Sequence, residues 1–144
     1  MRIRVQVVIE RAQASVHEVA ELKRGALRAE TLGLGLEEAK DLLAQVQDVM
    51  VAEQVRACLA QHLGCPDCGR TRRHKDARTI TVQTLFGVLR LESPRWHHCA
   101  CRPQATKTFS PLAGVLPERT SPELLYLEAN RRPGLLRPQH QALG

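Results

Sequence analysis

The chain has 144 residues, a length that fits one domain or two small ones and excludes a large multidomain enzyme. With 43% hydrophobic and 25% charged residues it can bury a core, although an aromatic content of 3% predicts a modest one. No apolar run approaches the roughly 20 residues of a membrane-spanning helix, and the N-terminus lacks a signal-peptide pattern. We therefore expect a soluble, cytoplasmic protein with no membrane partner.

The formal net charge of +6 is concentrated in the second half of the chain. Residues 1–64 hold 8 basic and 9 acidic residues, whereas residues 65–144 hold 13 basic and 6 acidic residues. This asymmetry favours a polyanionic partner for the second half, above all nucleic acid. A solvated basic surface without a partner is the alternative, and charge alone does not decide between them.

The first half predicts a strand followed by two helices. Residues 2–10 alternate between apolar and polar side chains, which is typical of a half-buried strand. Apolar residues from about Ser15 to Arg28 and from Leu36 to about His62 recur at helical spacing. Few heptads of the longer helix have apolar residues at all the positions that a coiled coil requires. We therefore favour a helix that packs in the core of a monomer over one that forms the contact between subunits of a homo-oligomer. Cys58 falls in this pattern as a small core residue.

The remaining four cysteines form two close pairs, Cys65 with Cys68 and Cys99 with Cys101. An odd total of five cysteines without a secretory signal argues against a disulfide framework. The stretch 65–69 (Cys-Pro-Asp-Cys-Gly) has the spacing of a zinc knuckle. Four thiolates in two clusters predict one closed, structural zinc site per chain, with these four cysteines as ligands.

Two alternatives to this ligand set stay open at the level of sequence. The second pair has one intervening residue, so its chelate is tighter than usual, and His97 or His98 could supply the fourth ligand instead. A redox dithiol at Cys65 and Cys68 is the weaker interpretation, because no βαβ pattern surrounds it.

Between the cysteine pairs, residues 78–85 and 88–91 are β-branched or alternating, with Phe86-Gly87 as a turn. Knuckle, hairpin and second knuckle predict a zinc ribbon over residues 65–103. Trp96 could stack on a nucleic-acid base or pack in the small core of the ribbon, and packing is the favoured role because a small ribbon needs an aromatic side chain. The loop 70–78 carries five basic side chains suited to DNA phosphates, namely Arg70, Arg72, Arg73, Lys75 and Arg78.

The last part of the chain predicts one short helix. Ser121 is a suitable N-cap for a helix that begins at Pro122 and continues through Glu128. The sequence thus predicts an α+β fold in four parts: a strand and helices over 1–64, the ribbon over 65–103, a linker and short helix over 104–129, and a disordered tail over 130–144.

Several stretches together resemble the N-terminal region of bacterial insertion-sequence transposases of the Kra group. The resemblance covers about residues 1–129 and rests on the order and spacing of the stretches 24–27, 30–34, 65–69, 84–87, 99–101, 109–112 and 122–128. In that family this region precedes a catalytic domain of the RNase H-like type, in which acidic residues bind two metal ions and cut DNA ends.

The resemblance implies a DNA-binding zinc-ribbon fragment of a transposase. Residues from Asn130 onward depart from the family and read like an altered reading frame, and no acids here form a two-metal set. We therefore expect a truncated or frameshifted copy without catalysis of its own, whose partner is DNA, in the family the transposon ends. The alternative function is a zinc-stabilised oligomerisation module that associates with intact transposase.

Overall fold

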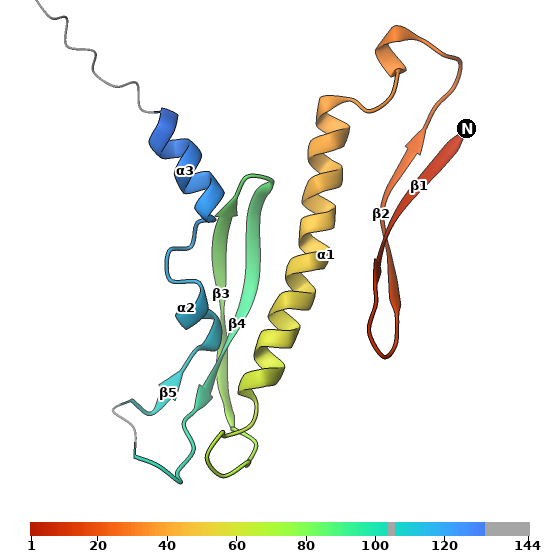
Figure 1. The fold of residues 1–144 in the computed structure, drawn as a ribbon. Helices are drawn as coiled ribbons and strands as arrows, with labels where there is room; N and C mark the ends of the chain where they lie inside the picture. Colours follow the sequence, from red (N-terminus) through yellow and green to blue (C-terminus); the bar gives the residue numbers. More distant parts are fainter. Residues whose placement is uncertain (104–105, 132–144) are drawn as a thin grey trace, which may run out of the picture.

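The computed structural model describes residues 1–103 and 106–131, and these form an α+β fold (Figure 1). An antiparallel sheet of β1 (Arg2–Ile9) and β2 (Ser15–Lys23) is followed by a 3₁₀ turn and by the long helix α1 (Leu36–His62). A second sheet has the order β3 (His74–Thr84), β4 (Gly87–His97) and β5 (Thr108–Phe109). The short helices α2 (Pro111–Val115) and α3 (Pro122–Arg131) complete the fold.

The predicted helix over residues 15–28 is wrong, because residues 15–23 form the strand β2. The two strands pair from Arg2 with Lys23 to Ile9 with Ser15, and their register shifts between Val5 and Gln6. At this bulge Val19 and Ala20 are both half-buried in succession. A bulge interrupts the period of two, so the apolar residues of a strand can imitate helical spacing.

The long helix α1 has the predicted bounds and lies between the two sheets (Figure 1). The Glu38 side chain accepts the Gly35 backbone N–H at 2.9 Å and so caps its first turn. Two ion pairs at 2.6 Å, Arg24 with Glu38 and Arg11 with Glu53, join it to the N-terminal hairpin. On the other side, the Gln47 amide donates to the Thr84 hydroxyl of β3 at 2.9 Å.

The core lies in the second sheet and under α2. The predicted hairpin is present and longer than expected, with its turn at Leu85 and Phe86. Its inner face buries apolar side chains beneath Leu112 of α2, which is 2% exposed; these side chains are Ile80, Val82 and Leu89. The sheet therefore depends on a helix from the segment predicted to be a linker.

The C-terminal part of the described chain attaches to the outer edge of β3. Gln83 donates its backbone N–H to the Arg119 carbonyl at 2.9 Å and accepts from the Ser121 N–H at 2.8 Å. The Ser121 hydroxyl accepts the Leu124 N–H at 3.4 Å, which confirms the predicted N-cap. Asn130 and Arg131 are helical, contrary to the predicted tail, whose other residues (132–144) lie outside the described part.

Within residues 1–103 and 106–131, no helix is both long enough and apolar enough to cross a membrane.

Candidate metal centre

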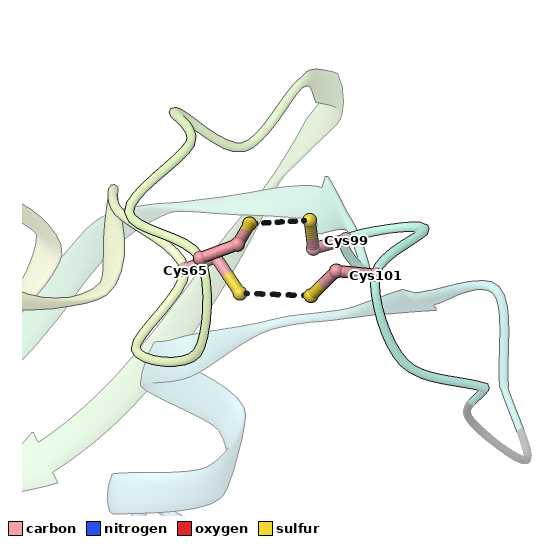
Figure 2. Close-up of side chains that lie close together, drawn as sticks. Cys65, Cys99 and Cys101 are labelled. Carbon is pink, nitrogen blue, oxygen red and sulfur yellow. Dashed lines mark hydrogen bonds between the residues drawn. The ribbon is translucent and has the colours of Figure 1, made fainter.

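The four paired cysteines come together at one end of the second sheet, between the knuckle before β3 and the loop after β4. The Cys65 and Cys101 sulfurs are 3.6 Å apart, and the Cys68 and Cys99 sulfurs are 3.3 Å apart (Figure 2). All four sulfurs lie within 4.8 Å of one another, and among the described residues they form a cluster that could hold a metal ion.

These separations fit metal coordination better than disulfide bonding. Sulfurs bound tetrahedrally at about 2.3 Å from one ion are about 3.8 Å apart, close to the separations found here. A disulfide requires about 2.05 Å, and all five cysteines are free. Each knuckle supplies one sulfur to each of the two close contacts, so two sulfurs lie on either side of a central point (Figure 2).

The first knuckle is built by local backbone hydrogen bonds. The Gly69 N–H donates to the Cys65 carbonyl at 2.9 Å, and the Cys65 N–H donates to the Arg70 carbonyl at the same distance. Gly69 has φ +73°, a left-handed conformation that glycine adopts without strain. The knuckle turn also points the N–H groups of Cys68 and Asp67 at the Cys65 sulfur and lowers the pKa of this thiol to about 7.

The pKa values of the two thiols in the second pair, Cys99 and Cys101, are shifted in opposite directions. The Cys101 backbone N–H lowers the pKa of the Cys99 thiol. The Cys99 side chain, followed by those of Cys65 and Cys68, raises the pKa of Cys101 to about 12. Three neighbouring sulfurs thus oppose a further thiolate, so four thiolates here require a compensating cation.

The two histidines proposed as substitute ligands do not belong to the cluster. The His98 ring stacks on Phe109 with 4.8 Å between centroids, and its Nε2 lies 3.2 Å from the Thr106 hydroxyl. Among the described residues the cluster contains cysteine only, so the ligand set of four cysteines is the one that the geometry supports.

An aromatic group supports the cysteine cluster from the β5 side. Trp96 is 6% exposed and meets Phe109 edge-on at 6.3 Å, which confirms its predicted packing role. Phe109 was missed by sequence reasoning, although Thr108-Phe109 is a β-prone pair that closely follows the second knuckle. Because β5 pairs with β4 at Trp96, the end of the ribbon is three-stranded.

Arg72, one of the five predicted DNA contacts, lies inside this arrangement. Its Nη1 donates to the His62 carbonyl at the end of α1 at 2.8 Å, and its guanidinium lies 4.7 Å from the Phe109 ring centre. This geometry makes Arg72 a link between the ribbon and the long helix. The other four predicted contacts are exposed, namely Arg70, Arg73, Lys75 and Arg78.

Comparison of the chain with protein-family models, with curated proteins and with solved structures finds no match.

Proposed function

We propose that the four cysteines hold one structural zinc ion and that the resulting ribbon presents a basic surface to the phosphate backbone of DNA. The observation that carries the proposal is the convergence of four sulfurs within 4.8 Å, directly beside the basic segment 70–78. Zinc suits this cluster because sulfur-only sites with four ligands are typical of structural zinc, which leaves no position open for catalysis.

The exposed basic side chains of the segment 70–78 are not paired with acidic side chains of the described residues, so they can bind an external anion. Asp76, the one acid in the segment, is bound by Arg95 across the hairpin, with Arg95 Nε donating to Oδ1 at 2.5 Å. Within the described residues, no carboxylate lies within 4.0 Å of Arg70, Arg73 or Lys75. The strand β3 and the knuckle fix the backbone of these residues, so the charges can follow a phosphate chain without ordering a loop.

The resemblance to the N-terminal region of Kra-group transposases supports the same function. In a protein of that kind the ribbon would help to bind transposon ends. Phosphate contacts position a protein on DNA but carry no sequence information, so this basic surface supplies affinity rather than target choice.

Salt-dependent DNA binding tests the proposal. In the zinc-loaded chain, the logarithm of affinity for duplex DNA should fall linearly with the logarithm of salt concentration, with a slope of about −0.9 per phosphate contact. A variant with Arg70, Arg73, Lys75 and Arg78 replaced by Gln should show a shallower slope, by an amount that corresponds to the loss of about 3 to 4 phosphate contacts.

The matched control removes the same charge elsewhere, at Arg2, Arg4, Lys23 and Lys40. If both quadruple variants lose affinity equally, net charge alone drives binding and the ribbon surface is not the contact. If the parent chain shows no salt-dependent binding, the proposal of phosphate contacts is wrong.

A further inference from the structure

The two close contacts of the cysteine cluster both join the first knuckle to the second. The sulfurs of Cys65 and Cys101 are 3.6 Å apart, and those of Cys68 and Cys99 are 3.3 Å apart (Figure 2). The partners are 36 and 31 residues apart in the sequence. A sulfur–sulfur bond is about 2.05 Å long, so each pair needs to approach by only about 1.5 Å to form one.

The cluster is open to solvent on one side. Cys68 and Cys101 are exposed and Cys99 is half-buried, whereas Cys65 is 6% exposed. A small polar oxidant such as a hydroperoxide therefore reaches one sulfur of each contact. Cysteines bound to a metal ion are thiolates, and the exposed thiolate is the form that such oxidants attack.

Backbone hydrogen bonds position the two knuckles opposite each other. The His97 N–H, just before the second knuckle, donates to the carbonyl of Arg73, just after the first, at 2.9 Å. The Arg72 N–H donates to the Leu63 carbonyl at 2.8 Å and so closes the first knuckle at its base. The opposing sulfurs are thus held near one another by the folded ribbon, which favours reaction between them over reaction with another molecule.

Four cysteines allow three sets of two disulfides. A set within the knuckles requires Cys99 to bond Cys101 across a single residue, which strains the geometry of a disulfide. A set that joins Cys65 to Cys99 and Cys68 to Cys101 requires both close contacts to be exchanged. The set that follows the close contacts, Cys65 with Cys101 and Cys68 with Cys99, requires the smallest movement.

We propose that oxidation by a hydroperoxide exchanges the metal ion of this centre for two disulfides, Cys65–Cys101 and Cys68–Cys99, and that the ribbon stays folded when the ion leaves. The proposal rests on the proposed zinc site and is independent of DNA binding. Before any peroxide is added, the purified chain holds zinc and no disulfide.

Each disulfide forms in two steps that consume one molecule of hydrogen peroxide. In the first step an exposed thiolate attacks the peroxide, the O–O bond breaks, and a sulfenic acid and hydroxide form. In the second step the opposing thiolate attacks the sulfenic sulfur, so that an S–S bond forms, the S–O bond breaks and a second hydroxide leaves. Protons from solvent convert both hydroxides to water. Four thiolates, two peroxides and four protons thus give two disulfides, four waters and a free zinc ion.

The order of the two reactions follows from distance and exposure. Cys68 and Cys99 have the shorter separation and neither is buried, whereas the other contact includes the buried Cys65. The disulfide Cys68–Cys99 therefore forms first, while two thiolates still bind the metal ion. A bond across 31 residues removes conformational freedom from the unfolded chain, so it stabilises the ribbon before the ion leaves.

Graded oxidation of the full, zinc-loaded chain with hydrogen peroxide tests the proposal. A zinc-sensitive dye should record the release of about one ion per chain after about two molecules of peroxide have reacted. Cleavage before Asp67 and fragmentation beside Ala100 separate the four cysteines for mass spectrometry, which should find the two disulfides between the knuckles. With half of this peroxide, Cys68–Cys99 should predominate; an excess of Cys65–Cys101 would overturn the order.

Hydrogen exchange measures whether the ribbon stays folded. The oxidised, metal-free chain should keep the protection of β3 and β4 in the presence of a chelator, whereas the reduced chain should lose it. Cys58 lies on α1 with its sulfur 3.9 Å from His62 Nδ1, so Cys58→Ser is the matched control and should leave zinc release and disulfide pairing unchanged.

Three results would overturn the proposal: a disulfide between Cys65 and Cys68, disulfides between chains, or loss of protection on oxidation. Zinc content before oxidation separates this failure from failure of the proposed function. A reduced chain that binds no zinc overturns both, whereas a zinc-loaded chain that gives any of the three results overturns only the exchange.

Discussion

The two halves of the molecule are stabilised in different ways. Every buried side chain of the described residues comes after residue 64, in the ribbon and α2, where Cys65, Trp96 and Leu112 are at most 6% exposed. The hairpin of β1 and β2 has no buried residue, and the ion pairs Arg24–Glu38 and Arg11–Glu53 join it to α1. Burial thus stabilises the half that also contains the possible metal site, while backbone hydrogen bonds and surface charges hold the other half.

This difference indicates where the fold is most and least resistant to change. A two-stranded hairpin is marginal alone, and exposed ion pairs contribute little to stability. The ribbon has a small core too, but four cysteines at its open end form a cluster that could hold a metal ion, and a metal ion bound there would add to the free energy of folding.

The largest expected effect is loss of the metal. Cys99→Ser/Cys101→Ser, or treatment with a chelator, should unfold the ribbon, because zinc binding in such small sites supplies most of the free energy of folding. Hydrogen exchange should show β3 and β4 losing protection, whereas β1 and β2, which have no buried residue and which we expect to exchange fast even in the intact protein, should change least. Cys58→Ser is the control; equal loss of protection there would assign the effect to cysteine replacement in general.

The next effect comes from the core beneath α2. Leu112→Ala should lower the free energy of unfolding by about 3 kcal/mol, since it removes a fully buried side chain and leaves a cavity. Leu22→Ala in the half-exposed β2 should lower it by only about 1 kcal/mol. Urea denaturation of the zinc-loaded chain measures both, and equal losses would contradict the contrast between the two halves.

A smaller effect separates two neighbouring arginines. Arg72→Gln should lower the free energy of unfolding by about 1–2 kcal/mol, because it removes the bond to the His62 carbonyl and the contact with Phe109. Arg73→Gln should leave stability unchanged and reduce the salt slope of DNA binding by about 1. Were Arg72→Gln instead to change only DNA binding, its assignment as an internal link would be wrong.

The smallest effect is a pH dependence at the hairpin. The Arg24 side chain, followed by the Gly35 N–H, lowers the pKa of Glu38 in the folded protein below its usual 4.5. The resulting stabilisation is present above pH 4.5 and is lost as the pH falls through the lower, folded pKa. Glu38→Gln should remove this acid dependence. Any release of metal in acid affects the parent chain and the variant equally, so it drops out when the stability of one is subtracted from that of the other at each pH. Identical pH profiles would show that the pair does not hold the hairpin.

Features set by local sequence were predicted well. Helical spacing and the glycines around it gave α1 its bounds, β-branched runs indicated the β3–β4 hairpin, and cysteine spacing selected the four residues that converge. Each of these depends on residues close to one another in the chain, and the cysteine pairs need only one long-range contact to meet.

Features that depend on distant contacts were missed. The strand β2 was mistaken for a helix because a bulge broke its alternation, and only its pairing with β1 decides its conformation. Arg72 carries the same charge as its neighbours, and its different position follows from contacts with the end of α1 and with Phe109. Charge and spacing do not reveal which arginine in a basic run turns inward.

The most direct test of the central claim is X-ray absorption at the zinc edge, together with the metal content of the purified chain. The account predicts about one zinc ion per chain, surrounded by four sulfurs at about 2.3 Å and by no nitrogen or oxygen ligand. A folded ribbon without metal, or one in which the cysteines are joined as disulfides, would contradict it.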